Sequence, residues 1–339
     1  MRLRSIARKY YNFIKYNLGN PQLEFDYSTL PWIDHDNADI DAFVSKFPVS
    51  ADYPYNLKEK LEFWKKNGYV IFQKAVLEEQ IDALWNEFDE TMDNHEKYDM
   101  TALIEGYNNT RDIAIKKVPK EILKGIDTRV NEYHSASVLA KKVITHPYIT
   151  TFVKAVFDAP VVVYQTLVFR YGSQQDTHQD FPWVTPKIPS HLTASWIALE
   201  DISPDSGPLY YFPGSHKIRK FNFGTGILYR HGESVFGPKL FGKYLDWKCK
   251  KEGLTKQALC IKKGDVLIWH SALVHGGLQI ANPELTRKSL VCHYTTTNAY
   301  PAHKWKRDEA PTISYYNDIA VYANPLLREE EDSIVMEKA

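Results

Sequence analysis

Three residues have the types and spacing to bind a catalytic metal ion: His178 and Asp180, which form a His-x-Asp pair, and His275 much further along the chain. Two imidazoles and one carboxylate on one face of a metal ion leave three coordination positions open, which is the ligand set of non-haem Fe(II) oxygenases. Structural sites with four protein ligands leave no such room. We therefore predict that His178, Asp180 and His275 bind a metal and form the catalytic centre.

The segments around these residues support this interpretation. Spacing alone would not, because a His-x-Asp pair arises easily by chance in a chain with 12 histidines. Stretches rich in β-branched and aromatic residues flank both ligand segments and predict strands over residues 161–169, 266–270 and 287–294. Gly172 follows the first of these strands, and Gly264 precedes the second, which is typical of turns.

The motifs together resemble those of the phytanoyl-CoA dioxygenase family, whose members are iron(II)- and 2-oxoglutarate-dependent oxygenases. They occur in family order over roughly residues 160–297, and weaker similarity extends back to about residue 57. The elements that carry the resemblance are His178-Gln179-Asp180, residues 193–199 around Trp196, residues 206–209, residues 213–217, Gly264-Asp265, His270, His275 and Arg287.

The resemblance implies a role for each matching residue. His178, Asp180 and His275 would bind Fe(II), with 2-oxoglutarate and O2 as co-substrates at the open positions. Arg287 would form a salt bridge with the distal carboxylate of 2-oxoglutarate, which suits the planar, bidentate geometry of a guanidinium group.

Further residues of the co-substrate pocket are also implied by the resemblance. Gln179 and Trp196 match positions that line the pocket in the family, and Thr166 is a candidate for a hydrogen bond to 2-oxoglutarate. The chain departs from the family at Gly277, where many members have a serine, so that a hydroxyl able to contact the co-substrate is missing. This departure does not affect metal ligation, but it leaves open that the co-substrate is an acid other than 2-oxoglutarate.

Several of these residues also have a purely structural interpretation. Trp196 alternates with polar neighbours and would be an ordinary core residue of a β-sandwich, and Arg287 could be a surface cation. His270 lies an odd number of residues before His275, so we expect it on the opposite strand face, in a supporting or packing role. His216 is interpreted as structural, and His191 and His293 show no partner in the sequence.

The predicted fold is mainly β with added α: a double-stranded β-helix (jelly-roll, cupin-like) core with N-terminal helices. Helices are predicted over residues 57–67, 77–94 and 146–157, and a strand over residues 69–72. Residues 1–56 would form an N-terminal basic segment and acidic arm. Residues 57–339 would form a single catalytic jelly-roll domain, with helical support (57–157) and a basic insertion (217–256).

Composition is that of a soluble globular enzyme, with 339 residues of which 44% are hydrophobic and 25% charged. The cysteines, Cys249, Cys260 and Cys292, lack the spacing of a zinc site or a disulfide framework, which favours a reducing compartment and a cytoplasmic location. No run of about 18 apolar residues predicts a membrane span, and no continuous apolar core predicts a signal peptide.

The N-terminal region changes sign along its length. Residues 1–20 contain five basic and no acidic residues, with apolar residues near helical spacing, and thus predict a basic amphipathic helix. Residues 1–18 are therefore a candidate for contact with a membrane surface or a partner. The alternative is that they pack on the core or fray. Residues 21–45 contain six acidic residues and no Lys or Arg, and their prolines predict an extended, ordered arm.

The segment 217–256 carries ten basic and three acidic residues, interleaved with aromatic residues. We interpret it as an insertion that covers the mouth of the site and favours an anionic, for example phosphate-bearing or carrier-linked, substrate. A solvated lysine-rich face is the alternative. A nucleic-acid partner is not expected, because the sequence pI is near 7.2 and no nucleic-acid-binding module is recognised.

The resemblance predicts an Fe(II)- and 2-oxoglutarate-dependent dioxygenase that hydroxylates a C–H bond of a small or carrier-linked metabolite, with succinate and CO2 as co-products. Halogenating relatives have a small residue in place of Asp180, so the carboxylate favours hydroxylation, or desaturation or ring formation. Two alternatives stay open: a jelly-roll protein that binds a ligand without oxidising it, and a metal-dependent cupin-like enzyme that does not use 2-oxoglutarate. The sequence does not give the oligomeric state.

Overall fold

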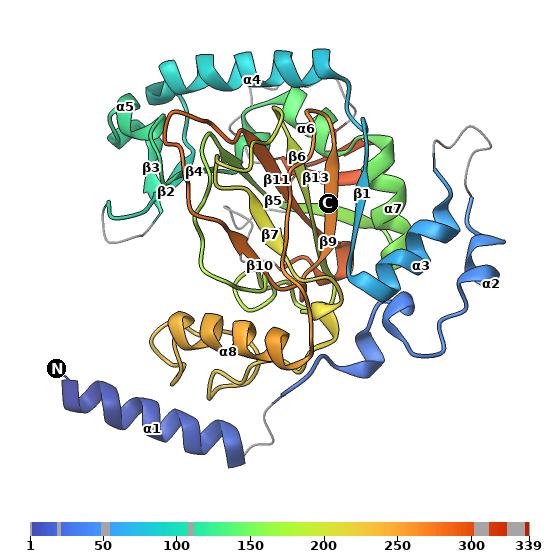
Figure 1. The fold of residues 1–339 in the computed structure, drawn as a ribbon, viewed down its shortest axis with the longest axis vertical. Coiled ribbons are helices and arrows are strands. Elements are labelled where there is room, and N and C mark those ends of the chain that lie inside the picture. Colours follow the sequence, from blue (N-terminus) through green and yellow to red (C-terminus); the bar gives the residue numbers. More distant parts are fainter. Residues whose placement is uncertain are drawn as a thin grey trace.

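The computed structural model describes residues 2–18, 22–48, 55–107, 112–301, 312–323 and 336–338. Two β-sheets form the centre of the molecule, and helices cover the larger sheet (Figure 1). The prediction of a mainly β jelly-roll core with N-terminal helices is thus confirmed. No helix in the described ranges is both long enough and apolar enough to cross a membrane.

The larger sheet is antiparallel except where β13 runs parallel to β5. Its main strands follow the order β1 (Tyr69–Phe72), β9 (Val266–His270), β6 (Leu192–Ala198), β11 (Ser289–Thr296), β5 (Val161–Phe169), β13 (Ile319–Ala323), β12 (Thr312–Tyr316) and β14 (Met336–Lys338). Beside β5, the short strands β4 (Thr128–Asn131), β2 (Thr101–Ile104) and β3 (Ile113–Ala114) extend the sheet.

The smaller sheet has the order β10 (His275–Gly277), β7 (Leu209–Tyr211) and β8 (Gln257–Ala258). Its residues Leu209 and Tyr211 join one apolar cluster with side chains of the larger sheet, among them Trp196, Trp269 and Val291. Because successive strand residues face opposite sides, the other side chains of the larger sheet are free to pack on the helices. The two faces thus have different roles, one toward the site and one toward the helical layer.

The helices predicted from the hydrophobic pattern are confirmed to within one residue at each end. They are α3 (Leu57–Asn67), α4 (Glu78–Asp93) and α7 (Pro147–Phe157), and α2 (Ile40–Val44), α5 (Lys120–Leu123) and α6 (Val138–Ile144) complete the layer. Helix α3 begins at an Asn56 side-chain cap and ends at Gly68, whose backbone is left-handed (φ 77°). Its buried residues Leu57, Leu61 and Trp64 recur at helical spacing.

The segment 217–256 contains α8 (Pro238–Lys251) and a core of its own. Its aromatic residues Phe221, Phe223 and Phe241 pack with Tyr210 of β7 and with Val274, next to the ligand segment. Its lysines lie mainly on the outside. The insertion is therefore fixed to the barrel through its aromatic side chains.

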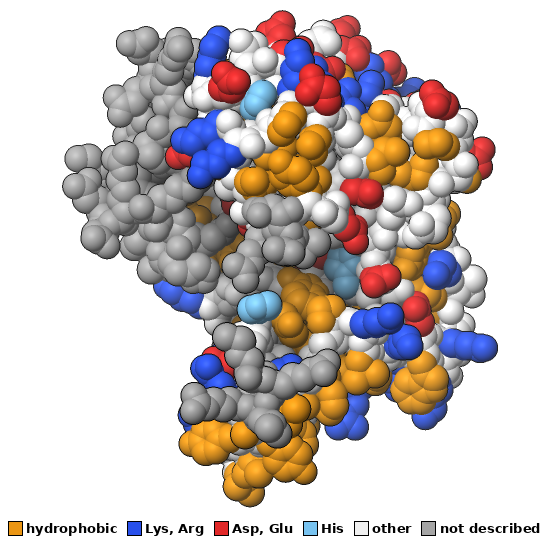
Figure 2. Space-filling view, turned by 90° about the vertical axis from the view of Figure 1, so that its left-hand side faces the viewer, with side chains coloured by type: hydrophobic (Ala, Val, Ile, Leu, Met, Phe, Trp, Pro, Cys, Tyr) orange, Lys and Arg blue, Asp and Glu red, His pale blue; other side chains and the backbone are white. Residues whose placement is uncertain are grey.

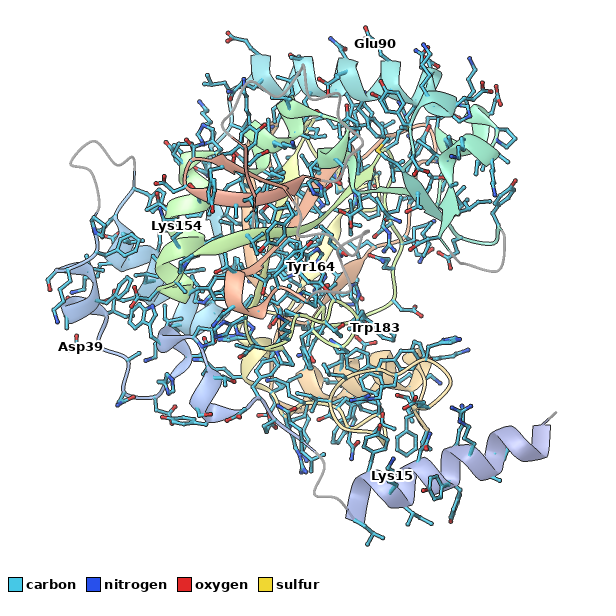
Figure 3. All side chains as sticks on the ribbon, turned by 180° about the vertical axis from the view of Figure 1, so that it is seen from behind. Lys15, Asp39, Glu90, Lys154, Tyr164 and Trp183 are labelled. Atoms are coloured by element: carbon cyan, nitrogen blue, oxygen red, sulfur yellow. The ribbon has the colours of Figure 1, made fainter. Side chains whose placement is uncertain are left out.

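The sequence predicted an extended, ordered arm over residues 21–45, but the described residues 22–45 form short helices and are not extended throughout. The arm contains the short 3-10 helices η1 (Tyr27–Thr29) and η2 (Trp32–Asp34), followed by α2. Trp32 Nε1 donates a hydrogen bond to Ala155 O of α7 (2.8 Å), and the indole stacks on Phe43 with ring centroids 4.0 Å apart. Ile33 between them is completely buried. Helix α1 (Arg2–Leu18) precedes the arm and extends away from the body of the molecule (Figures 1 and 3).

Gly264 provides a test of how strictly the turn before β9 constrains the sequence. Its φ is +84°, and an added Cβ would collide with the backbone oxygen of Val76. We expect Gly264→Ala to lower the free energy of unfolding by at least about 2 kcal/mol, measured by urea denaturation. Gly253→Ala is the matched control, because Gly253 has φ +70° with open space around it and should cost only about 1 kcal/mol. Equal losses would mean that the contact with Val76 is unimportant.

Candidate metal centre and co-substrate pocket

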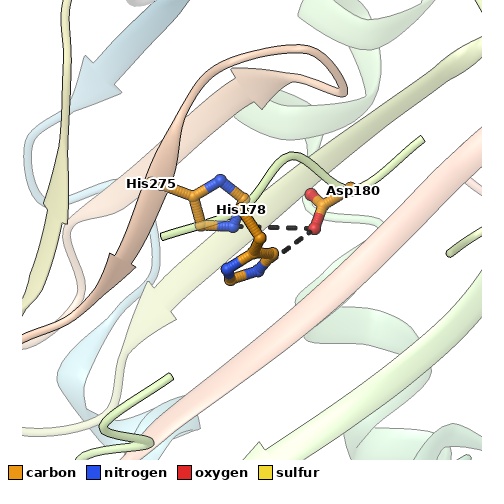
Figure 4. A group of neighbouring side chains, drawn as sticks. All are labelled: His178, Asp180 and His275. Atoms are coloured by element: carbon orange, nitrogen blue, oxygen red, sulfur yellow. Dashed lines mark ion pairs between the residues drawn. The ribbon is translucent and has the colours of Figure 1, made fainter. Parts of the chain in front are cut away.

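His178, Asp180 and His275 lie close together and all line one cavity. Figure 4 shows their side chains. One ligand atom from each residue falls within 4.8 Å of the others. Asp180 Oδ1 is 3.8 Å from His178 Nε2 and 3.6 Å from His275 Nε2. No other group of His, Cys, Asp and Glu in the described part of the chain meets the same criterion for a metal site. The sequence prediction therefore has the expected geometry.

A backbone bridge brings the two histidines together. His178 N donates to His275 O (2.8 Å) and His275 N donates to His178 O (3.0 Å), forming an isolated antiparallel β-bridge. His275 also belongs to β10, where it pairs with Tyr211 of β7. The smaller sheet thus fixes His275, and the bridge transfers this constraint to His178.

Both histidines present the same ring nitrogen to the centre. His178 Nδ1 is 2.7 Å from Asp176 O, and His275 Nδ1 is 3.0 Å from Leu273 O. A carbonyl oxygen only accepts hydrogen bonds, so each Nδ1 carries the proton and each Nε2 keeps its lone pair. These two lone pairs and Asp180 Oδ1 form the donor set that a divalent cation needs.

Electrostatics favour the protonation states required for metal binding. Burial, and then the neighbouring His275, lowers the pKa of His178 to about 4. For Asp180 burial acts to raise the pKa, but the surrounding histidines, His275 foremost, outweigh it and hold the pKa well below its usual range. Neutral imidazole at His178 and a carboxylate at Asp180 therefore coexist at neutral pH, which fits the donor set to a cation.

The second oxygen of Asp180 is held by residues that do not belong to the triad. Trp269 Nε1 of β9 donates to Asp180 Oδ2 (2.8 Å), and His293 Nε2 of β11 lies 3.4 Å from the same oxygen. With Oδ2 held in this way, Oδ1 is turned toward the two histidines. Orientation by neighbouring donors is how proteins prepare a carboxylate for monodentate ligation.

The cavity has a volume of about 580 Å³ and is lined from both sheets, from the segment 173–178 and from the insertion. Its wall includes Trp196 of β6, Phe169 of β5 and Arg287, two residues before β11. The Arg287 guanidinium lies 5.6 Å from the ring centre of Phe169 and 5.5 Å from that of Trp196. Aromatic side chains therefore flank the cation that the sequence assigned to the co-substrate.

Arg287 is 2% exposed, and its Nε has no hydrogen-bond partner among the described residues. Burial lowers its pKa to about 10, against the opposing effect of Glu200, so that it remains charged at neutral pH. Glu200 itself is engaged by Lys288 N (2.7 Å) and Thr286 Oγ1 (2.8 Å). A buried guanidinium that faces a cavity, and to which no carboxylate of the described residues is bonded, is suited to an anionic ligand.

The structure brings Trp196 and Arg287 to the cavity, but not Thr166 or Gln179. Thr166 faces the other side of β5, where its hydroxyl lies 2.8 Å from His134 Nδ1. Gln179 is completely buried, and its Nε2 donates to Ala272 O (2.5 Å). On β5 the side chains that reach the cavity are those of the neighbouring odd-numbered residues, including Gln165 and Leu167.

Trp269, His293 and Arg129 of β4 are among the cavity residues that sequence reasoning missed. His293 could have been found, because it shares the strand parity of Arg287 and therefore its face. No motif in the neighbouring sequence indicated that Trp269 or Arg129 would line the cavity. Arg129 is a second cation in the wall, and its Nε has no partner among the described residues.

The supporting interpretation of His270 agrees with its position. Its ring faces away from the cavity, and its Nε2 lies 3.2 Å from Asp34 Oδ2 of the arm. His216 packs beside it, with ring centroids 5.4 Å apart, and is likewise remote from the cavity. His191 contacts Thr296 Oγ1 at 2.7 Å and has no place in the site.

A sequence model of the phytanoyl-CoA dioxygenase (PhyH) family matches residues 64–289, which is more than half of the chain. The chain therefore belongs to this family. It is 23% identical over 265 residues to the peroxisomal phytanoyl-CoA dioxygenase of Homo sapiens, covering 75% of this chain and 73% of the human protein. The corresponding protein of Rattus norvegicus is 22% identical over 268 residues, covering 75% of this chain and 72% of its own length.

Solved structures show the same fold. EctD from S. alaskensis with bound Fe aligns with a TM-score of 0.56 and 14% identity, covering 82% of this chain and 84% of EctD. The epimerase SnoN, solved with Fe3+, alpha ketoglutarate and nogalamycin RO, aligns with a TM-score of 0.52 and 16% identity, covering 72% and 86% of the two chains. At these identities the likeness concerns the fold.

Family membership and the His-Asp-His site together confirm the class predicted from the sequence. The protein is an Fe(II)- and 2-oxoglutarate-dependent dioxygenase, with Fe(II), 2-oxoglutarate and O2 as its cofactor and co-substrates. The donor set described above fits such an ion, and a small-molecule or CoA-linked substrate is consistent with the family.

The hydrogen bond from Trp269 to Asp180 gives a test of how the carboxylate is oriented. We expect Trp269→Phe to weaken Fe(II) binding roughly 10- to 100-fold, because Asp180 Oδ2 loses its donor, while the fold is retained. Anaerobic Fe(II) titration measures the affinity. Trp64→Phe is the control, since Trp64 is also buried but its Nε1 has no partner among the described residues. An unchanged affinity in Trp269→Phe would remove Trp269 from the site.

Proposed function

We propose that His178, Asp180 and His275 hold Fe(II), that Arg287 binds the distal carboxylate of 2-oxoglutarate, and that the enzyme hydroxylates a C–H bond of a small or carrier-linked metabolite. The observation that carries this assignment is the buried guanidinium of Arg287 in the same cavity as the triad, with its Nε unpartnered among the described residues. A protein that only bound a neutral ligand would have no need for this buried charge.

The residues of the chain divide the work of the reaction. Bound Fe(II) would supply oxidation by O2, in which one oxygen atom enters the substrate as a hydroxyl and the other enters succinate as 2-oxoglutarate loses CO2. Arg287 orients the co-substrate by its distal carboxylate, since a bidentate guanidinium fixes direction as well as distance. Trp196 and Phe169 exclude water around this ion pair and thereby strengthen it.

Ser173 is a candidate for the hydroxyl that the chain lacks at Gly277. A Cβ built on Gly277 would lie 2.8 Å from Ser173 Oγ and 2.7 Å from Gln174 N, so the segment 173–175 already fills the space of a side chain there. Ser173 also lines the cavity with Arg287. We therefore propose that Ser173 contributes the polar contact to 2-oxoglutarate that a residue at position 277 cannot make.

The proposed substrate is anionic, as the basic insertion suggested. Pro238 and Phe241 of α8 line the cavity near Trp183, and the lysines of α8 lie on the outside of the same helix. Arg129 adds a cation inside the cavity. The names of the relatives, phytanoyl-CoA dioxygenases, favour a carrier-linked acid as the class to screen first. Hydroxylation is preferred to desaturation or ring formation, and a cytoplasmic location is proposed from the free cysteines.

The first experiment is an anaerobic titration of the apoprotein with Fe(II) and 2-oxoglutarate, monitored by the metal-to-ligand charge-transfer absorption. We expect a saturable band that disappears in His275→Ala. In Arg287→Ala the concentration of 2-oxoglutarate at half saturation should rise by roughly two to three orders of magnitude, because a buried charge pair is lost. Arg287→Lys keeps the charge without the bidentate geometry. Its half-saturating concentration of 2-oxoglutarate should lie between those of the native protein and Arg287→Ala.

The same titration can also contradict the proposed role of Arg287. If Arg287→Ala bound 2-oxoglutarate as tightly as the native protein, the co-substrate would be held elsewhere. Ser173→Ala should raise the half-saturating concentration only severalfold, because it removes a single neutral hydrogen bond. An unchanged value in that variant would reject the role of Ser173 and leave that of Arg287 intact.

A further inference from the structure

Helix α1 has an apolar face that nothing in the described structure covers. Its side chains are strongly exposed: Ile6 57%, Tyr10 69%, Tyr11 65%, Ile14 47% and Leu18 83%. At 100° per residue these positions form one continuous stripe, with Arg8 and Lys15 at one border and Lys9 on the other side. The helix has no acidic residue, and the side chains of residues 1–5 lie outside the described part.

The contacts that hold α1 to the body lie at one edge of this stripe and beyond it. Phe13 approaches the position of Gly224 in the insertion, and the Tyr16 ring lies 5.5 Å from the Arg230 guanidinium. The rest of the apolar stripe is therefore left free when the helix is in place, as the exposed apolar side chains at the lower end of the molecule show (Figure 2).

Helix α8 has an outward face of the same chemistry. Leu240 is 48% exposed and Trp247 54% exposed. Around this pair lie exposed lysines at positions 239, 243, 250 and 251, of which Lys251 places its Nζ 5.1 Å from the ring centre of Trp247. The acidic residue of the helix, Asp246, is engaged by Thr177 Oγ1 at 2.8 Å.

The inward face of α8, opposite Leu240 and Trp247, forms part of the wall of the catalytic cavity. Its first turn supplies Pro238 and Phe241 to the lining, and Gly242 packs against Thr177, the residue before His178. Trp183, which is 37% exposed, lies in the cavity wall beside them. In Figures 1 and 3, α1 and α8 occupy the same end of the molecule.

We propose that α1 and the outward face of α8 dock the enzyme on an anionic phospholipid bilayer. Exposed Tyr, Trp and Leu side chains suit the interfacial region of a bilayer, and the surrounding lysines and arginines suit anionic headgroups. The bilayer would then lie beside the wall of the catalytic cavity that α8 provides. This inference does not depend on the identity of the substrate. It assigns the same binding partner, the bilayer, to the exposed faces of α1 and α8.

Sedimentation of the full chain with vesicles tests this surface. Binding should occur with phosphatidylcholine vesicles that contain phosphatidylserine, and should fall at high salt and with phosphatidylcholine alone. Ile14→Asp and Trp247→Ala should each reduce binding about tenfold. Leu77→Asp is the matched control, because Leu77 is 61% exposed but precedes α4, away from both helices.

Two results would overturn the proposal. One is equal binding of the native protein and both variants. The other is a concentration-dependent dimer that Ile14→Asp dissociates, since a second copy of the chain would then be the occupant of the apolar stripe.

A second inference comes from a separate observation, the contact between the acidic arm and β9. Ala272 N donates to His270 Nδ1 (2.9 Å), so this nitrogen carries no proton. The proton of the neutral ring is then on Nε2, which lies 3.2 Å from Asp34 Oδ2 and donates to it. Ala272 N and Asp34 together therefore fix the tautomer and the orientation of His270.

The loop that His270 holds is the one that positions the metal ligands. Ser271 O accepts a hydrogen bond from Asp180 N (2.9 Å), and Leu273 O accepts one from His275 Nδ1 (3.0 Å). Between them, Ala272 O accepts from Gln179 Nε2. Consecutive carbonyl groups of a single loop thus orient both segments of the triad.

We infer that Asp34 is a positioning residue for the metal centre, acting through His270 and the loop 271–274. The arm is secured for this role by Trp32 on α7, and Phe25 of the arm packs against Phe181, the residue after Asp180, with ring centroids 4.9 Å apart. The inference rests on the proposed metal centre only in its effect on Fe(II), since the tautomer of His270 can be observed without metal.

Imidazole 15N NMR of the apoprotein, together with Fe(II) titration, tests this inference. The native protein should show His270 protonated at Nε2. Asp34→Ala should lose this fixed tautomer and bind Fe(II) about tenfold more weakly, within the range known for partners of ligand residues. Asp34→Asn keeps an acceptor and should restore both properties. Asp36→Ala, at an exposed site of the same arm, is the control.

The possible outcomes separate the two proposals. A native-like tautomer and Fe(II) affinity in Asp34→Ala would overturn the positioning role, as would equal weakening in Asp34→Ala and Asp34→Asn. If the native protein bound no Fe(II) while the tautomer responded to Asp34 as expected, the metal assignment would fail and the contact between arm and loop would stand.

Discussion

The pair of backbone hydrogen bonds between His178 and His275 is the interaction on which the rest of the site depends. It joins two segments that lie far apart in the chain, and it does so at the edge of the smaller sheet, where β7 already holds His275. Backbone bonds of this kind set the distance between the histidines without using their side chains. Each Nδ1 is then free to donate to a carbonyl oxygen, and each Nε2 is left to bind a metal ion.

Buried charge is the second constraint. Asp180 and Arg287 are both removed from water, and such groups are stable only when they are paired. Trp269 and His293 provide partners for one carboxylate oxygen of Asp180, and the other oxygen faces the two histidines of the triad. For Arg287 it provides aromatic walls and open space. The two incomplete environments face one cavity, which is where a cation and a dicarboxylate would complete them.

The segments outside the barrel contribute to the same centre. The insertion packs its aromatic core against Val274 and Tyr210, close to His275, and its helix α8 forms part of the cavity wall. The arm reaches the loop 271–274 from the opposite side through Asp34 and His270. Regions that the sequence shows as charged additions to a catalytic core are thus in direct contact with the elements that hold the metal ligands.

The sequence by itself determined α3, α4 and α7 and the strands near residues 69–72, 161–169 and 266–270, because periodicity is a local property. It also marked the triad and Arg287 as candidates, through short motifs that resemble those of a known family. Parity from Arg287 into β11 could have placed His293 on the same face, but the sequence analysis did not use it, and the contact of His293 with Asp180 could not be foreseen. Only the tertiary structure decided that Thr166 and Gln179 turn away from the cavity, and that Trp269 orients Asp180. Asp34 and His270 are separated by 236 residues. Such contacts depend on which elements lie side by side, and no local pattern encodes that arrangement.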